Sequence, residues 1–226
     1  MEKNSTYLDK VYRFTKGERI THWTHAICFL LLFFTGLGML SLAFRPAMDI
    51  FGGILVARNI HRVAAVIFVV VVAINFFVGE GGRNLRGWLK AVASFGKDDM
   101  AHAMNFPIEF FGGHRPFPPQ GKFNGGEKLN SAITITGTIF IVISGFMLWF
   151  APSIPRVIVE WAYPVHSGFA LLMGAFLLAH MYLSILHPDS NQALKGMING
   201  YVPGRFAFEH YEKWYSEVKD DPRNMQ

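Results

Sequence analysis

Four long stretches of the chain are apolar and lack charged side chains over the length of a helix. They lie between Arg19 and Arg45, Arg62 and Glu80, Lys128 and Arg156, and Glu160 and Asp189. A bilayer core of ~30 Å needs about 20 helical residues. The second stretch reaches that length if its helix starts near Arg58, with Arg58 and Arg62 extending to the headgroups. The pattern predicts an all-α integral membrane protein, a bundle of four transmembrane helices at about 20–44, 58–78, 129–150 and 163–186.

The remaining segments carry turn residues and charge. Residues 80–128 form a loop rich in Gly-Gly and Pro signals, with a short amphipathic helix expected near Leu85–Phe95. The tail, residues 189–226, mixes aromatic with charged side chains, which is typical of a membrane interface or of a docked partner. Neither segment is large enough for a separate catalytic domain, so we expect a single membrane domain over residues 1–226.

The charges predict the orientation of the helices. Of the 21 Lys and Arg residues, 17 lie in the N-terminal segment, the long loop and the tail. Only four lie on the other side: Arg45, Arg58, Arg62 and Arg156. The positive-inside rule therefore places both termini and the loop in the cytoplasm. This explains the net charge of +5 without a nucleic acid partner. The first apolar stretch is too long for the core of a signal peptide, so we expect it to stay as an anchor.

Histidines occur in or at the edge of the apolar stretches at depths that pair them. In this topology His61 and His166 lie near the outer face, whereas His22 and His180 lie nearer the cytoplasm. His166 and His180 are 14 residues apart, about 21 Å of helical rise on nearly one face. An imidazole in hydrocarbon is costly unless it is paired or ligated, and helix bundles commonly hold cofactors between facing helices. We therefore expect two haem b groups, each with two histidine ligands.

Alternatives exist for these and the other histidines. Any single histidine in the membrane is as readily explained by a hydrogen bond to a neighbouring hydroxyl or carbonyl group as by a bond to haem iron. His25 lies one turn from His22 on nearly the same face and is a second candidate ligand. The others are expected to be surface residues: His102, His114, His187 and His210.

Small residues complete the membrane pattern. The single cysteine, Cys28, excludes an iron–sulfur cluster and a covalently attached c-type haem, and we expect it to be a small hydrophobic residue buried in lipid. Four glycines in the first and third helices either make room for porphyrin or allow close helix packing: Gly36, Gly38, Gly137 and Gly145.

Several motifs together resemble the cytochrome b membrane subunit, or gamma subunit, of respiratory formate dehydrogenases, over nearly the whole chain. They are Arg19–Trp23, Arg58–His61, Lys122–Lys128, His166 with His180–Tyr182, and Gly196–Gly200. The resemblance implies two haem b groups in a subunit of the bacterial inner (cytoplasmic) membrane. It implies an iron–sulfur beta subunit as electron donor, a molybdenum or tungsten alpha subunit that oxidises formate, and menaquinone or ubiquinone as acceptor. It also favours His22 over His25 as the ligand.

The resemblance further implies a quinone site before the third helix. The family's motif there is usually Asn-Ala-Gly-Gln-Lys, and its quinone-lining positions correspond to Asn124, Gly126 and Glu127. Glutamate replaces glutamine here, and a carboxylate at this place can also relay protons. Restoring glutamine is expected to have little effect. From the residues alone, Asn124–Gly126 is equally a turn that starts the helix, with Glu127 near its positive end.

Other functions fit part of the pattern. The chain also resembles the cytochrome b subunits of nickel–iron hydrogenases and of thiosulfate or polysulfide reductases. A different class is a haem-free membrane anchor or a small transporter with a histidine proton relay. Transporters usually show intramembrane acids, inverted repeats or broken helices, and none is evident in the sequence. We expect no residue that oxidises formate here, only the quinone-reducing part of an enzyme complex.

Overall fold

The computed structural model describes residues 7–77, 79–111, 113 and 115–224, which are mostly helical. The elements in order are β1 (Lys10–Tyr12), α1 (Lys16–Leu40), the 3-10 helix η1 (Leu42–Phe51), α2 (Ile54–Phe77), α3 (Gly79–Ala93), α4 (Lys97–Phe110), α5 (Gly125–Trp149), η2 (Ala151–Ser153), α6 (Arg156–Met181), the π-helical turn η3 (Tyr182–Leu186), α7 (Ala193–Asn199), β2 (Tyr201–Pro203), α8 (Gly204–His210), α9 (Glu212–Val218) and η4 (Pro222–Asn224).

Four of these helices are long and apolar enough to cross a membrane. They are α1, α2, α5, and α6 continued through η3 as Arg156–Leu186. Their apolar windows have a mean hydropathy between 1.8 and 2.3, and few of the side chains in them are buried by protein. Such helices are stable where lipid covers the apolar surface. The prediction of four helices long and apolar enough to span a membrane is confirmed.

The helices begin earlier along the chain than the charge-free stretches suggested. α1 starts at Lys16 because Thr15 and Glu18 form a capping box. The Thr15 amide donates to Glu18 Oε2 over 2.7 Å, and the Glu18 amide donates to Thr15 Oγ1 over 3.2 Å. α1 also ends earlier than expected, at Leu40, and η1 follows it. Charged residues are compatible with a first helical turn at the headgroups, so the charge-free stretches mark depth rather than helix ends.

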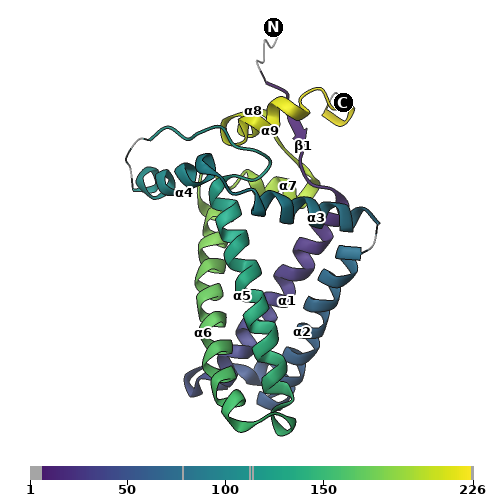
Figure 1. Ribbon diagram of the computed structural model, residues 1–226, viewed down its shortest axis with the longest axis vertical. Coiled ribbons are helices and arrows are strands. Elements are labelled where there is room, and N and C mark those ends of the chain that lie inside the picture. The colour runs from purple at the N-terminus through teal and green to yellow at the C-terminus, as the bar shows by residue number, and fades with distance from the viewer. Residues whose placement is uncertain (1–6, 78, 112, 114, 225–226) are drawn as a thin grey trace. The chain divides into compact units, whose positions relative to one another are not determined.

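The chain forms two compact units. The first, here called the bundle unit, consists of Ile20–Leu85 and Thr134–Leu178. It holds most of α1, α2, α5 and α6, which run alongside one another (Figure 1). Close packing in this unit depends on glycine: Phe33 occupies the space that a Cβ atom on Gly174 would need. Small residues of this kind let membrane helices approach closely.

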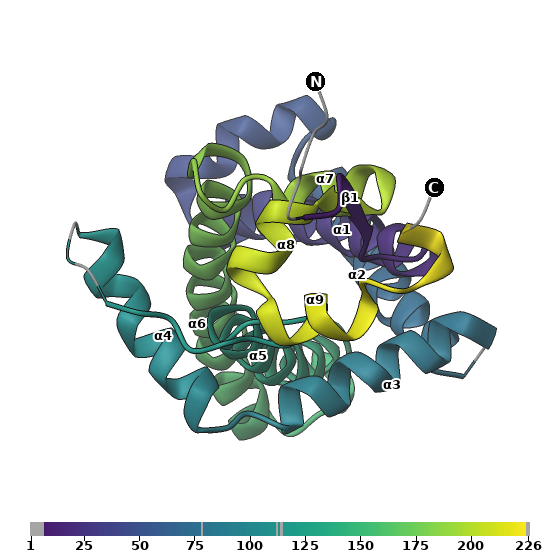
Figure 2. The same ribbon diagram turned by 90° about the horizontal axis from the view of Figure 1, so that it is seen from above.

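The second unit, here called the terminal unit, consists of the two ends of the chain, up to Arg19 and from Ala179, together with Arg86–Ile133. In it β1 pairs antiparallel with β2, with Val11 opposite Val202, and β1, α7, α8 and α9 are grouped together (Figure 2). Its hydrophobic core is made of residues from both ends of the chain: Val11, Val202, Phe206, Ala207, Tyr211, Trp214 and Tyr215.

This core corrects the interpretation of the aromatic tail. Four aromatic residues that we expected at a membrane interface or against a partner are buried within the chain itself: Phe206, Tyr211, Trp214 and Tyr215. The N-terminal strand supplies the apolar surface that covers them. Three-residue strands are too short for a recognisable alternation of apolar and polar residues, so the sequence did not reveal this pairing.

The long loop is also more ordered than expected. α3 confirms the predicted amphipathic helix, whereas α4 was not predicted. The Gly96 amide donates to Asp99 Oδ2 over 2.9 Å at the start of α4. The backbone of Asp99 then occupies the space that a Cβ atom on Gly125 would need, so the first turn of α4 packs directly against the start of α5 within the terminal unit.

Candidate functional site

His61 on α2 and His166 on α6 face one another inside the bundle unit. Their ring centroids are 6.3 Å apart, with an angle of 62° between the ring planes. The structure thus brings together the two histidines that the sequence placed at the same outer depth. Both rings are half-buried.

Hydrogen bonds define the protonation of the His166 ring. Its Nδ1 lies 3.0 Å from the carbonyl oxygen of Ile141 and 3.2 Å from Ser144 Oγ. A carbonyl oxygen only accepts, so Nδ1 must carry the hydrogen. The lone pair is therefore on Nε2, which is the form of imidazole that binds a metal.

The His61 ring is held in the same way. Its Nδ1 lies 2.9 Å from Thr35 Oγ1, and that hydroxyl group donates its only hydrogen to the carbonyl oxygen of Leu31 over 2.5 Å. Thr35 can then only accept from the ring, so His61 also carries its hydrogen on Nδ1. Thr35 is fully buried. The two rings are therefore oriented and protonated alike, each with a lone pair on Nε2.

Two of the four predicted glycines stand beside these rings. A Cβ atom on Gly36 would lie 3.5 Å from His61 Cε1, and one on Gly145 would lie 3.0 Å from His166 Cε1. Gly38 and Gly137 instead pack against Met48 and Met173. Gly36 and Gly145 thus leave space at the histidine pair, and the other two allow close packing.

The histidine pair fits the axial positions of a haem iron. Two metal–nitrogen bonds of about 2 Å, each extended by roughly 1.1 Å to the ring centre, separate two ring centres by about 6 Å, close to the observed distance. Within the described ranges no three or more His, Cys, Asp and Glu side chains gather around a common point. Two imidazoles are sufficient for a haem, because the porphyrin supplies the other four nitrogen ligands.

The candidates for a second haem lie in different units, with His22 and His25 in the bundle unit and His180 in the terminal unit. The Nδ1 of His25 lies 2.9 Å from the carbonyl oxygen of Thr21. Its Nε2 is buried without a hydrogen bond of ordinary geometry to any described residue. His22 makes an edge contact with Trp23. The pairing of His22 with His180 stays a prediction, and His25 stays the alternative.

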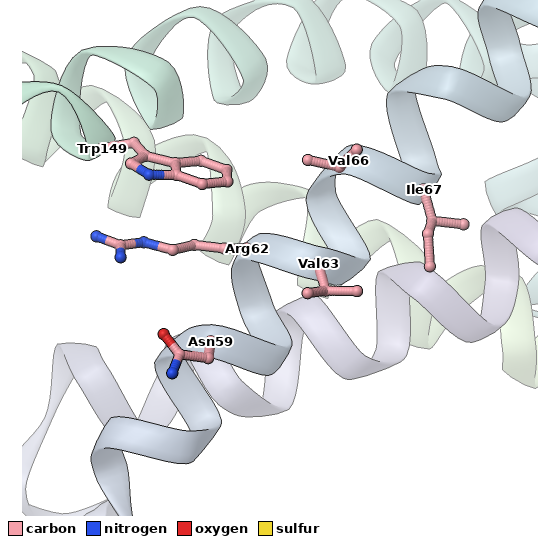
Figure 3. A pocket seen from close by; sticks show the side chains of 6 residues that line it. All are labelled: Asn59, Arg62, Val63, Val66, Ile67 and Trp149. Atoms are coloured by element: carbon pink, nitrogen blue, oxygen red, sulfur yellow. The ribbon is translucent and has the colours of Figure 1, made fainter.

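Next to His61 in the sequence, Arg62 points to a different face of α2. Its guanidinium lies 5.1 Å from the ring centre of Trp149 (Figure 3). The two side chains border an open hollow of about 420 Å³ that is otherwise lined by Asn59, Val63, Val66 and Ile67. The hollow contains neither His61 nor His166, so it is separate from the histidine pair.

In the terminal unit, Asn124 and Glu127 form a capping box at the start of α5. The Glu127 amide donates to Asn124 Oδ1 over 2.9 Å, and the Asn124 amide donates to Glu127 Oε2 over 3.0 Å. This arrangement satisfies two backbone donors that a helix start otherwise leaves without partners. The interpretation of this segment as a helix start is confirmed.

Glu127 is also one member of a partly buried ionic network. Arg13 Nη2 lies 3.1 Å from both carboxylate oxygens of Glu127, and the Tyr211 hydroxyl donates to Oε1 over 2.8 Å. The Arg13 guanidinium also stacks 3.9 Å from the centre of the Tyr211 ring. Burial by itself lowers the pKa of Arg13, but the charges of Glu127 and Tyr211 and the hydrogen bonds to them together outweigh it, and the pKa is raised. Burial raises the pKa of the Tyr211 hydroxyl. No pattern in the sequence pointed to either partner, since both are far from Glu127 along the chain.

The remaining histidines and Cys28 can now be placed. His102 on α4 is 7% exposed and packs against Phe117 with the rings tilted by 34° and their centres 4.7 Å apart, so the prediction of a surface residue is wrong. His187 and His210 are half-buried, and His114 lies outside the described residues. Cys28 is 5% exposed, so the protein itself buries this side chain, where we expected lipid to cover it.

Comparison with known proteins agrees with these features. Residues 13–200 match the family model described as prokaryotic cytochrome b561. The chain is 28% identical over 214 residues to the formate dehydrogenase cytochrome b556(fdo) subunit of Escherichia coli K12, covering 93% of this chain and 94% of the relative. It is 25% identical over 206 residues to the nitrate-inducible formate dehydrogenase cytochrome b556(Fdn) subunit of the same organism, covering 89% and 88%.

A third relative is the formate dehydrogenase cytochrome b556 subunit of Haemophilus influenzae, 23% identical over 229 residues, with 96% of this chain and 89% of the relative covered. The family match spans both members of the histidine pair and all four long helices. The chain belongs to the prokaryotic cytochrome b561 family and is a multi-pass membrane cytochrome that binds haem b.

Proposed function

We propose that this chain is the di-haem b subunit of a membrane-bound formate dehydrogenase and carries electrons from an iron–sulfur subunit to quinone. The observation that carries the proposal is the His61–His166 pair, in which both Nδ1 atoms are hydrogen-bonded and both Nε2 atoms have a lone pair. The names of the relatives support formate dehydrogenase, since they match over most of the chain. Membership of a cytochrome family favours this function over a haem-free anchor.

In this proposal His61 and His166 hold the outer haem, and His22 and His180 hold the inner one, with His25 as the alternative to His22. α6 is continuous from His166 to His180, so it contributes one ligand to each haem. The two ligands are about 21 Å apart along the helix axis. When bound, the haems supply one-electron transfer. Two haems at opposite depths suit the passage of electrons across the membrane.

The proposed orientation places both termini and residues 80–128 in the cytoplasm, with the protein in the bacterial inner membrane. The asymmetry of Lys and Arg supports it. Formate oxidation takes place in a separate molybdenum or tungsten alpha subunit, and the iron–sulfur beta subunit docks on the outer side. The short outer segments between the helices are the surfaces available to it.

Quinone is proposed to react at the inner end, beside Asn124, Gly126 and Glu127. Glu127 lies within electrostatic range of the proposed ligand His180 in the same unit. The Oδ1 atom of Asn124 caps α5. The Nδ2 atom of the same side chain has no partner among the described residues, so it can donate a hydrogen bond to a quinone carbonyl. Because Arg13 and Tyr211 already engage the Glu127 carboxylate, its proposed role is to hold this segment in place.

Removing the amide donor of Asn124 is expected to slow quinone reduction. Asn124→Ala and Asn124→Ser should both retain both haems and their reduction by formate in the complex. Reoxidation of the haems by quinone should slow by about tenfold, the effect of losing a hydrogen bond of roughly 1–1.5 kcal/mol. Stopped-flow absorbance at the haem bands measures both steps.

The serine variant separates binding from helix capping. Serine is a good N-cap residue, whereas alanine loses about 1 kcal/mol at such a position. A slow Asn124→Ala with a fast Asn124→Ser would mean that only the cap matters, and it would place the quinone elsewhere. Wild-type reoxidation in both variants would contradict the proposed site outright.

Reversing the charge of the outer arginines is expected to weaken docking of the iron–sulfur subunit. Arg45, Arg58 and Arg156 are exposed. In the part of the chain that the structure describes, only Arg156 has an acidic partner, Glu160, at 2.7 Å. The triple change to Glu should lower retention of the partner subunit by about tenfold or more, with a steeper loss at high salt. Co-purification at two salt concentrations measures it.

Arg205 on α8 provides the matched control. It is also exposed and also pairs with a glutamate four residues later, Glu209, at 2.7 Å, but it belongs to the proposed cytoplasmic side. Arg205→Glu should leave retention unchanged. Unchanged retention and electron transfer in the triple variant would show that the partner does not use this surface.

A further inference from the structure

The terminal unit contains a buried histidine, His102, that has no role in the proposed function. We propose that His102 transfers protons to quinone at the Asn124–Glu127 segment and that His210 resupplies it. This inference rests on the proposed function, because it needs quinone to be reduced at that segment.

The packing of α4 against α5 places His102 beside the segment. The Asp99 backbone fills the space next to Gly125, and Lys128 Nζ lies 2.9 Å from Asp99 Oδ2. His102 follows Asp99 by three residues on α4, and residues spaced by three share a helix face. The side chain of His102 therefore lies on the face of α4 that meets the start of α5.

The His102 ring has a nitrogen without a hydrogen bond. Its Nδ1 is buried and has no partner in the described part of the chain, although the ring itself is well packed against Phe117. A buried polar atom without a partner destabilises a fold, so such atoms are rare and call for an explanation. Exchange of a proton with quinone during turnover would explain why this nitrogen has no permanent partner.

The charges around the two histidines suit proton transfer. Burial lowers the pKa of His102, and the charge of His210 lowers it further, whereas Glu127 and Asp99 raise it in part. Burial also lowers the pKa of His210, and the charge of Arg13 lowers it further. The carboxylates of Glu209, Glu127 and Asp189 raise this pKa in part. Both imidazoles are therefore mainly neutral near pH 7 and able to accept and release a proton.

His210 links this pair to solvent. It is half-buried at the end of α8 and packs against Phe206 with ring centres 4.4 Å apart. Its ring also lies beside that of Tyr211, with ring centres 6.2 Å apart, and the Tyr211 hydroxyl donates to Glu127 Oε1. A proton that His210 takes from water therefore arrives next to the Asn124–Glu127 segment. Glu127 is less suited to this task because Arg13 and Tyr211 already donate to its oxygens.

The chemistry balances with the electrons of the proposed function. Reduction of quinone to quinol takes up two electrons from the haems and two protons from the cytoplasm. In each proton transfer an N–H bond of the protonated His102 breaks and an O–H bond forms on the quinone oxygen. His102 is left neutral and is protonated again from water through His210.

Two substitutions of His102 test the proposal in the intact complex. His102→Phe keeps an aromatic ring against Phe117 but cannot carry a proton, and His102→Ala leaves a space. Both should retain haem content and reduction by formate. Reoxidation by quinone should slow by about tenfold or more. The rate should fall more at pH 8 than at pH 6, because direct protonation of the quinone by solvent becomes slower as the proton concentration falls. His210→Gln should show a smaller effect in the same direction.

Added imidazole distinguishes proton transfer from packing. It should restore the reoxidation rate of His102→Ala but not of His102→Phe, whereas pyrrole, which has a similar shape and no basic nitrogen, should restore neither. His187→Phe is the control, since His187 also contacts a phenylalanine, Phe110, in the same unit, with ring centres 5.8 Å apart. Its rates should equal those of the wild type at every pH.

Wild-type reoxidation at pH 8 in the His102 variants, or equal rescue by pyrrole, would overturn the proposal. If both His102 variants lose haem, His210→Gln decides, and an unchanged rate at pH 8 in that variant overturns it. Failure of the proposed function looks different, because haems of the wild-type complex would then not be reoxidised by quinone at any pH.

Discussion

Replacement of His166 with alanine is expected to remove about half of the haem b while the protein stays in the membrane. The reason is that His166 and His61 lie at the distance required for one iron and that each haem site in such a bundle binds independently. His61→Ala should cause the same loss. The pyridine haemochrome assay counts the haem per chain, and a reduced-minus-oxidised spectrum shows which haem is left.

Ser144→Ala is the matched control for this experiment. Ser144 also contacts His166 Nδ1, but the carbonyl oxygen of Ile141 accepts from the same atom. The ring should therefore keep its orientation, and the haem content should stay within a few per cent of the wild type. Complete haem retention in His166→Ala would contradict the pairing of His61 with His166.

The second large effect is expected for Glu127→Gln, which should destabilise the terminal unit. Arg13 is 3% exposed, and the change leaves its guanidinium without a counter-ion. Breaking a buried ion pair from one side destabilises a protein by about 3–5 kcal/mol. We expect about 2–4 kcal/mol here, because the Glu127 side chain is one-third exposed. Thermal unfolding, together with the rate at which trypsin cleaves the tail, measures the loss.

This expectation reverses the one drawn from the family motif, in which glutamine is the usual residue at this position. A second change tests the reason. Arg13→Met combined with Glu127→Gln removes both charges and should recover much of the stability. Glutamine retains the capping box in both variants, so helix capping is held constant. Equal stability of Glu127→Gln and the wild type would show that the ion pair contributes little.

Much of the membrane part could be predicted from local pattern. A run of apolar residues long enough to cross lipid must be helical, because no other open structure satisfies its backbone groups there. Helix length then converts sequence position into depth, which is how His61 and His166 could be paired before any contact was known. The regular rise of a helix also related His166 to His180 on α6.

Local pattern did not extend to contacts between distant segments. Arg13, Glu127 and Tyr211 meet although 114 and 84 residues separate Glu127 from its two partners, and no spacing rule links residues so far apart. The burial of the tail aromatics depends on the N-terminal strand in the same way.

The burial of His102 also depends on packing that local sequence pattern does not reveal. Its segment contains turn signals and charge, which are typical of a solvated loop, yet the absence of a side chain at Gly125 lets α4 pack closely and bury the ring. The sequence by itself predicted the four long apolar helices and the pairing of His61 with His166, because these follow from helix length and rise. Only the tertiary structure decided which groups hold the two histidine rings, which carboxylate is paired and which histidine of the loop is buried, because these depend on packing between segments that are remote in the chain.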